Sequence, residues 1–425
     1  MSVSPLPVAP SRSHQVVAPA LRAPESAAAC VFAAIRRRGP VARDVIAAVS
    51  GLSIATVNRQ VSALLDAQLL RERPDLVAPG AIGRPRIPVE INREPYLTLG
   101  VHIGARTTSI AASDLLGRTL DAVETPTPGG PQSVALASLA DSARRYLSRW
   151  HRRRPLWAGV AIGGVVDNAG GRVDHSRLGW SQAPVGQAFA AELGLPVSVA
   201  SHVDAMAFAE VLGNRFGEEQ AGSGTSLYFY ARETVGIAQV INGRVHTPTS
   251  GPGTVAGLPV HSELLGGSGR LESTVSDEAV VSAARKLGIL PQSGPSSSVA
   301  TLRRIARDAD DRQSAGAREI LAERARVLGN AVALVRDILN PDDLVVGGQA
   351  FTEYPEGMQY VRAAFAEYSL LSPREIRMTT FGNRVQEASA SAVSLSSLYA
   401  DPIVAARRVR NRRRVTACPR QDSNL

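Results

Sequence analysis

The stretch Tyr96-Leu-Thr-Leu-Gly-Val-His-Ile-Gly104 is an apolar run that ends in glycine. A run of this length with so few polar residues is typical of a buried strand, and the final glycine favours a tight turn. A second apolar run over 108–112 leads into Asp114-Leu-Leu-Gly117, a turn sequence that predicts a hairpin. We therefore expect a sheet to begin here.

Beyond this hairpin, short apolar runs alternate with amphipathic stretches. We expect strands over 157–162, 197–200, 226–230, 236–241 and 343–346, and helices over 133–150, 204–213, 277–287 and 315–339. This alternation predicts an α/β fold, and we assign residues 94–400 to this large domain.

Upstream, residues 26–93 carry the pattern of a winged helix-turn-helix. Apolar residues at helical spacing followed by arginines predict a first helix over 28–38. Two further helices, over 41–49 and 53–65, are separated by a turn in which Gly51 permits a left-handed backbone. Ser53 is a suitable N-cap for the last of them. Short strands at 69–71 and 87–91 flank a basic tip and complete the wing.

The exposed start of the third helix is expected to contact DNA. Val57, Val61 and Leu64 mark the buried stripe of this helix, and its start carries Ser53, Ala55, Thr56, Asn58 and Arg59. Short polar side chains reach phosphates and base edges there, and arginine reads guanine. At the wing, Arg84 and Arg86 flank a proline and are expected to enter a narrow minor groove. The alternative is that the helix start is an ordinary solvated polar face and the wing an ordinary basic loop. This alternative is weaker because the three helices, the wing and the positive charge occur together.

Positive charge is concentrated at the two ends of the chain, which has a net charge of +9. Residues 1–95 contain twelve arginines and seven acidic residues, and residues 401–425 contain seven arginines and two acidic residues. This distribution favours nucleic acid as a partner of the ends. Residues 1–25 are rich in proline, serine and alanine, and we expect a disordered leader there. We expect a disordered basic tail over 401–425.

Cysteine content and hydropathy indicate a cytoplasmic protein. Cys30 and Cys418 are too few for a disulfide framework or a cysteine zinc site. The N-terminus has no apolar core of signal-peptide length, and no stretch approaches the roughly 20 apolar residues of a membrane span.

Several segments of the large domain keep the order and spacing of a known family. They are Leu99-Gly-Val-His-Ile-Gly104, Gly159-Val-Ala-Ile-Gly-Gly164 with Asp167, Leu178-Gly-Trp180, Leu195-Pro-Val197, and Asn340-Pro341 with Val345-Val-Gly-Gly348. Over residues 28–400 the chain resembles the ROK family, which groups sugar-responsive repressors with sugar kinases on an actin-like fold. The resemblance implies a two-lobed domain. Because the family's kinases usually lack the N-terminal module, it also favours a regulator.

Three differences remove the groups that the resemblance implies for a kinase. His102 stands where the kinases carry an acid, and Ser201-His202 replaces an Asn-Asp pair whose aspartate takes the proton of the sugar hydroxyl. Arg232-Glu-Thr-Val-Gly236 places bulk where a glycine-rich loop approaches phosphate. We expect no catalytic residue, no cofactor and no enzyme activity. The alternative, a ROK-type sugar kinase with an N-terminal extension, requires carboxylates at positions 102 and 202.

The family's zinc and sugar positions are also changed. A Glu-x-x-His motif becomes Thr254-Val-Ala-Gly257, and the cysteine cluster aligns with Glu263, Leu265 and Arg270. None of the four zinc ligands remains, so no metal is expected. The resemblance places an effector cleft, with a sugar-like ligand, at Ser201, His202, Thr254 and Glu272. Loss of all ligand response is the alternative.

These patterns together predict a DNA-binding transcriptional regulator, either a repressor or an activator, with a repressor favoured. Two-fold protein symmetry maps onto two half-sites, so we expect a homodimer or higher homo-oligomer on a pseudo-palindromic duplex. The large domain is expected to supply the dimer contacts.

Overall fold

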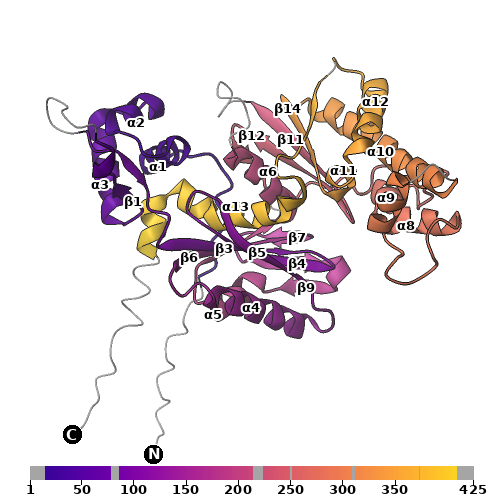
Figure 1. The fold of residues 1–425 in the computed structure, drawn as a ribbon, viewed down its shortest axis with the longest axis horizontal. Helices are drawn as coiled ribbons and strands as arrows, with labels where there is room; N and C mark the ends of the chain where they lie inside the picture. The colour runs from indigo at the N-terminus through magenta and orange to yellow at the C-terminus, as the bar shows by residue number, and fades with distance from the viewer. Residues whose placement is uncertain are drawn as a thin grey trace, which may run out of the picture.

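The computed structural model of the chain describes residues 15–77, 86–213, 224–248, 251–308, 312–372 and 374–408. It shows a small helical module beside a two-lobed α/β body (Figure 1). The strands and helices expected from the sequence in these ranges are present, with ends within a few residues of the expected ones. The predicted α/β class and the helix-turn-helix pattern are therefore confirmed.

The N-terminal module is a winged helix-turn-helix. Its elements are α1 (Ala27–Arg38), α2 (Arg43–Ser50), α3 (Ile54–Asp66), β1 (Leu70–Glu72), the 3-10 turn η1 (Pro74–Leu76) and β2 (Val89–Ile91). Gly51 has a φ of 67° at the corner between α2 and α3, a left-handed conformation that glycine adopts without steric cost. Phe32, Ile46 and Val61 are buried between the helices. β1 and β2 pair antiparallel, with Leu70 opposite Ile91.

The first lobe is built on a five-stranded sheet in the order β10-β6-β3-β4-β5. β3, β6 and β10 are parallel, and β4 and β5 form the expected hairpin. Helices α4 and α5 cover one face. The elements are β3 (Tyr96–Ile103), β4 (Thr107–Ser113), β5 (Thr119–Pro126), α4 (Gln132–Ser148), β6 (Arg154–Ile162), β7 (Val165–Asp167), β8 (Arg172–His175), η2 (Ser176–Leu178), β9 (Trp180–Ala183), α5 (Val185–Leu193), β10 (Val197–Ser201) and α6 (His202–Leu212).

The second lobe is built on a five-stranded sheet in the order β13-β12-β11-β14-β15. α6 packs on one face, and α7 to α12 form the main core on the other. The elements are β11 (Thr225–Ala231), β12 (Val235–Ile241), β13 (Arg244–Val245), α7 (Leu271–Val275), α8 (Asp277–Lys286), α9 (Val299–Arg307), α10 (Arg312–Leu339), β14 (Asp343–Gly347), α11 (Gln349–Thr352), η3 (Pro355–Gly357), α12 (Met358–Tyr368), β15 (Ile376–Met378), η4 (Gly382–Arg384) and α13 (Val385–Ala400).

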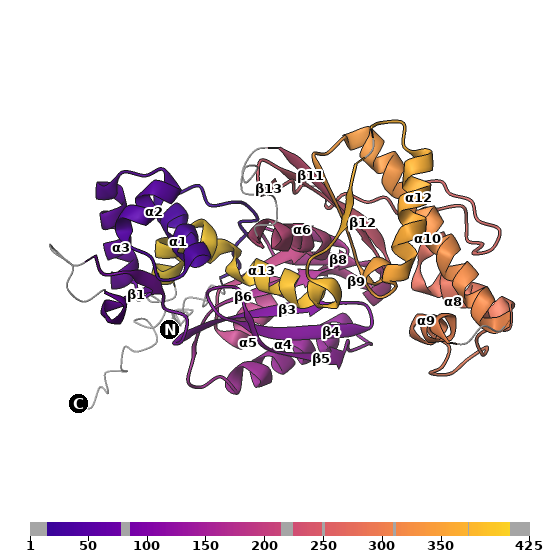
Figure 2. The ribbon, with the colours of Figure 1, turned by 45° about the horizontal axis from the view of Figure 1, so that its top comes forward.

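Helices α6 and α13 lie between the two sheets (Figure 2). α13 packs on β3 and β6 closely enough that the strands need glycine. A Cβ at Gly100 would lie 2.7 Å from the Ser391 nitrogen, and a Cβ at Gly159 would overlap the backbone of Ser394. Ser394 also donates to the Thr98 hydroxyl at 2.8 Å. Small residues along α13 thus bring the helix backbone directly onto the sheet.

The end of α13 holds the winged helix-turn-helix against the body. Tyr399 packs against Phe32 of α1 and lies beneath the Arg36 guanidinium, which is 4.7 Å from the ring centre. Arg36 also donates to the Leu212 carbonyl at 3.3 Å. The module and the first lobe share one apolar cluster, which includes Leu395. The module is therefore packed onto the body rather than tethered to it.

Two expectations about the chain ends are wrong within the described residues. Residues 15–25, expected to be disordered, are extended and hydrogen-bond to both lobes, because Leu21 is an apolar residue that can be buried there. Residues 402–408, expected to begin a disordered tail, are helical, and Ala405 is buried in the cluster that joins module and body. The remaining parts of the leader and tail lie outside the described residues.

Within the described ranges, no helix combines the length and the apolar character that crossing a lipid bilayer requires.

The contact between α13 and β6 predicts a large effect of a single methyl group. Gly159→Ala should lower the free energy of unfolding by about 2–3 kcal/mol, because backbone on both sides prevents relief of the overlap. Gly129→Ala is the matched control, since a Cβ there meets nothing within 4 Å. Chemical denaturation of the three proteins measures the difference, and equal stabilities would contradict this packing.

Candidate functional site

The residues expected to contact DNA gather at the start of α3. Ser53, Ala55, Asn58 and Arg59 are exposed, and Thr56 is half-buried. The Ser53 hydroxyl accepts from the Thr56 amide at 3.2 Å and donates to the Thr56 hydroxyl at 3.0 Å, so both side chains form the N-cap of α3. Asn58 and Arg59 make no side-chain hydrogen bond or ion pair with any described residue. Both side chains are therefore free to meet a partner.

At the wing, Arg86 forms an ion pair with Asp44 of α2 at 2.5 Å. The Arg86 side chain is 78% exposed, and a pair so exposed contributes only about 0–1 kcal/mol, so a phosphate can replace Asp44. Arg84, expected to act with Arg86, lies outside the described residues.

One exposed apolar residue at this face, which the sequence places off the buried stripe, was not among the residues expected to contact DNA. Ile54, the first residue of α3, is 49% exposed and lies beside the polar residues of the helix start. Its position off the buried stripe was the available signal, but an isoleucine is ordinarily assigned to a core. An exposed apolar side chain at this position suits contact with the methyl group of thymine.

The second candidate site is a cavity of about 300 Å³ between the lobes. It lies at the carboxyl ends of β3, β6 and β10, and the turn between β11 and β12 faces it from the second lobe. The structure brings together here all four residues expected for an effector cleft: Ser201, His202, Thr254 and Glu272. Glu272 accepts a hydrogen bond from the Val235 amide at 3.2 Å, which fixes its carboxylate in the wall.

Three histidines converge on this cavity. The rings of His102 and His202 are parallel, with centres 5.8 Å apart, and the Tyr230 ring lies 4.9 Å from that of His202. His175 accepts from the Leu178 amide through Nδ1. Both ring nitrogens of His102 are buried without a hydrogen-bond partner among the described residues. His175 and Tyr230 were not predicted, because only the fold brings β8 and β11 to the same wall.

Burial controls the charge of this histidine cluster. Burial, followed by the nearby His202 and Arg232, holds the pKa of His102 well below its ordinary value. Burial lowers the pKa of His202 to about 4, and it also lowers the pKa of His175. On α6, burial raises the pKa of Asp204 to about 7. The imidazoles are therefore neutral at neutral pH and offer both donors and acceptors to a polar ligand.

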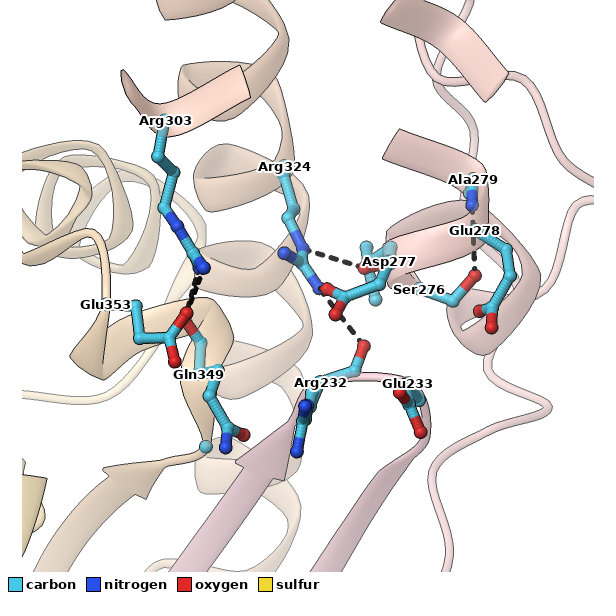
Figure 3. A network of polar contacts seen from close by, with 12 residues as sticks. Arg232, Glu233, Ser276, Asp277, Glu278, Ala279, Arg303, Arg324, Gln349 and Glu353 are labelled. Carbon is cyan, nitrogen blue, oxygen red and sulfur yellow. Dashed lines mark hydrogen bonds and ion pairs between the residues drawn. The ribbon is translucent and has the colours of Figure 1, made fainter. Parts of the chain in front are cut away.

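The turn between β11 and β12 is braced in a form unlike a glycine-rich phosphate loop. Arg324, buried in α10, donates to the Arg232 carbonyl at 3.1 Å and to Asp277 at 2.8 Å (Figure 3). Arg177 of the first lobe donates to the Glu233 carbonyl at 2.6 Å. These bonds occupy backbone carbonyls of the turn. The turn also carries the long side chains of Arg232 and Glu233, whereas a phosphate loop has glycines that let backbone amides approach a phosphate.

The loop that aligns with the family's zinc site is held by packing and hydrogen bonds. Leu265 and Leu271 are buried in the core of the second lobe. Ser262 accepts from the Leu265 amide at 3.2 Å and donates to Glu323 at 2.8 Å. His261 and Glu263 are exposed, and across the described residues no three His, Cys, Asp or Glu side chains are grouped as metal ligands. The residues present do not fit a structural zinc.

The fold and the cleft define a two-lobed actin-like protein with a winged helix-turn-helix, and comparison with known proteins gives its family. The ROK family model matches residues 98–400, and the chain belongs to the ROK family. Transcriptional regulator Mb0495 of Mycobacterium bovis is 64% identical over 94% of this chain and 93% of its own length.

More distant relatives agree with this placement. The DNA-binding transcriptional dual regulator NagC of Escherichia coli is 25% identical, over 76% of this chain and 80% of its own length. The crystal structure of a ROK family transcriptional regulator, a homolog of the E. coli MLC protein, superposes with a TM-score of 0.72 at 22% identity, over 89% of this chain and 97% of that one. The chain is thus a transcriptional regulator of the ROK family, as the sequence predicted.

The neutral histidines predict a pH dependence of stability. Unfolded histidine binds a proton below about pH 6.5, whereas folded His202, with a pKa of about 4, does not, so the contribution of His202 to stability falls as pH decreases from about 6.5 to about 4. Replacing His102 and His202 together with glutamine should flatten this fall by up to about 1.4 kcal/mol per pH unit for each histidine. The raised pKa of Asp204 acts in the opposite direction in both proteins and cancels in the comparison.

Denaturation midpoints measured across this pH range test the prediction. His261→Gln, at an exposed histidine, is the control and should behave as the parent protein does. A double variant with an unchanged pH profile would show that the cluster is charged in the folded protein.

Proposed function

We propose that the protein binds duplex DNA through α3 and the wing and represses transcription at a pseudo-palindromic site. The observation that carries the proposal is the exposed helix start, where Asn58 and Arg59 have no partner among the described residues and Ser53 with Thr56 caps the helix. Its relative NagC of Escherichia coli, a DNA-binding transcriptional dual regulator, supports it.

In this proposal, some side chains recognise bases and others position the protein on the duplex. Arg59 reads guanine in the major groove, Asn58 reads adenine, and Ala55 and Thr56 approach base edges and phosphates. Arg84 and Arg86 approach the minor groove, and Arg86 exchanges Asp44 for phosphate. Ser53 acts through the cap, because its hydroxyl holds the amide and hydroxyl of Thr56.

The rest of the chain serves this binding. Two copies address the two half-sites, with their large domains forming a homodimer or a higher homo-oligomer. Residues 26–93 form the DNA-binding unit, 94–400 the large domain, and residues beyond 408 add phosphate affinity through their arginines. Because its target is the chromosome, the protein acts in the cytoplasm.

The cleft serves as a sensor for a small polar, sugar-like ligand. Neutral imidazoles of His102 and His202, the Thr254 hydroxyl and the Glu272 carboxylate provide donors and acceptors around a cavity of about 300 Å³. A ligand there contacts both lobes at once. Such a ligand shifts the equilibrium between two arrangements of the lobes, and the size of the shift is set by the difference in its affinity for the two arrangements.

The first test concerns base reading. Arg59→Ala should cost about 1–3 kcal/mol of binding at one base position, because it removes a bidentate contact to guanine, and it should relax specificity there. Arg270→Ala, an exposed arginine of the second lobe, is the control and should leave binding unchanged. Titrations on duplexes selected in vitro and on their single-base variants measure both effects. Equal affinity of the parent protein for selected and random duplex at physiological salt would refute the proposal.

We also propose that the cleft has no kinase activity. A neutral histidine at position 202 cannot orient and deprotonate a sugar hydroxyl as a carboxylate does, and position 102 lacks an acid for magnesium. ATP turnover across a panel of hexoses should not exceed the background rate. Turnover at an ordinary enzymatic rate of about 1–1000 per second that His202→Ala abolishes would establish the opposite.

A further inference from the structure

The segment that precedes the winged helix-turn-helix, residues 15–25, contacts both lobes before it enters α1. We call it the strap. It first runs beside β10, the edge strand of the first lobe's sheet. Val17 donates to the Val197 carbonyl at 2.8 Å, and the Val197 amide donates to the Gln15 carbonyl at 3.0 Å. These bonds extend the sheet in parallel by one short strand.

A slot made by two glycines receives Val16 of the strap. A Cβ at Gly171 would lie 2.9 Å from a Val16 methyl group, and a Cβ at Gly186 would lie 3.0 Å from both methyl groups. Gly186 donates to the Gly171 carbonyl at 2.9 Å, so the two glycines are held together. Any side chain at either position would fill the space that Val16 occupies. The first lobe therefore has a shaped site for this one residue.

The strap next joins the edge of the second lobe's sheet. Arg22 pairs antiparallel with Arg244 of β13. The Val245 amide donates to the Leu21 carbonyl at 2.9 Å, and the Ala23 amide donates to the Gly243 carbonyl at 2.8 Å. Leu21 is buried in the cluster formed by α6, α13 and the second sheet. Main-chain pairing and a buried leucine thus fix the strap on this lobe as well.

The chain between these two attachments is short and stiff. Val17 and Leu21 are four residues apart, which limits their separation to about 14 Å when fully extended. Pro19 fixes one φ angle within this stretch, and the backbone amide of Arg22 donates to the Ala20 carbonyl at 2.8 Å. A short, stiff connection has little slack to absorb a movement of one lobe against the other.

The strap continues directly into the DNA-binding module. Only Pro24 and Glu25 separate Ala23, bonded to the second lobe, from Ser26, the N-cap of α1. Ser26 also donates to the carbonyl of Ala400, at the end of α13, at 3.3 Å. The start of α1 is therefore attached to the second lobe through the strap and to the helix between the lobes through its cap.

Both attachments lie at the ends of the sheets that point away from the cleft. On β10 the strap bonds to Val197, the first residue, whereas Ser201, the last residue, lines the cavity. On the second lobe it bonds to β13, which pairs with the end of β12, whereas Val235 and Gly236 at the start of β12 line the cavity. A rotation of the lobes about the helices between them therefore moves the cleft end of each sheet in one direction and the strap end in the opposite direction.

We propose that the strap couples the opening of the cleft to the position of the winged helix-turn-helix. This inference rests on the proposed DNA-binding function. Closing the cleft displaces the attachments on β10 and β13 relative to each other, and the stiff strap passes this displacement to the first turn of α1. Val16 and Leu21 are positioning residues, since they pack on the two lobes and act on DNA through α1.

Thermodynamic reciprocity allows a test without a cleft ligand. If the state of the cleft alters the affinity for DNA, then binding of DNA must alter the conformational equilibrium of the cleft by the same coupling free energy. Hydrogen exchange over residues 230–236 and 252–257 of the full-length protein is measured with and without a duplex selected in vitro. Exchange in these cleft segments should change when the duplex binds to the parent protein.

Two variants disrupt the contact from opposite sides, and a third is the control. Val16→Asp removes the methyl groups, and Gly186→Ala, a milder change, places a Cβ in their slot. Both should still bind the duplex while the exchange change in the cleft is lost. Ala18→Asp, at an exposed strap residue, should retain it.

The outcomes separate the two proposals. A parent protein that binds the duplex without any change in the cleft, or Val16→Asp and Gly186→Ala proteins whose clefts respond like the parent's, would overturn the coupling and leave DNA binding intact. A parent protein that binds no selected duplex would overturn the proposed function, and the coupling with it.

Discussion

The close packing of α13 on the backbone of Gly100 and Gly159 is the constraint on which the rest of the structure depends. Because the strands carry no side chain at these points, α13 lies directly on the first sheet, and the second sheet packs beyond it through α6. The same helix ends at Tyr399, where Phe32 and Arg36 attach the DNA-binding module. One helix therefore sets both the spacing of the lobes and the place of the module.

The cleft keeps the geometry of a ligand site while its chemistry differs from that expected of a phosphoryl-transfer site. Neutral imidazoles occupy the two positions where the family's kinases carry carboxylates, and burial together with neighbouring positive charge keeps them neutral. The adjoining turn is fixed by the contact of Arg324 with the Arg232 carbonyl. On this chemistry rests our proposal that the cleft binds a ligand without kinase activity, and the relative Mb0495 is likewise a transcriptional regulator.

Much of this architecture could be predicted from the sequence, and the limits of prediction have physical causes. Local signals were sufficient for the helix-turn-helix, since Gly51 and Ser53 determine its corner and cap. The convergence of His175 with His102 depends on long-range strand arrangement, which no local pattern contains. The strap resembled a disordered leader because its pairing partners, Val197 and Gly243, lie more than 170 residues away in the sequence.

Selection of duplexes from a random pool by the full-length protein tests whether this chain is a sequence-specific DNA-binding regulator. We expect enrichment of one motif made of two inverted half-sites, separated by about one helical turn of DNA or a multiple of it. A pool that remains random after repeated rounds at physiological salt, with protein shown to be folded, would show that the chain has no such specificity.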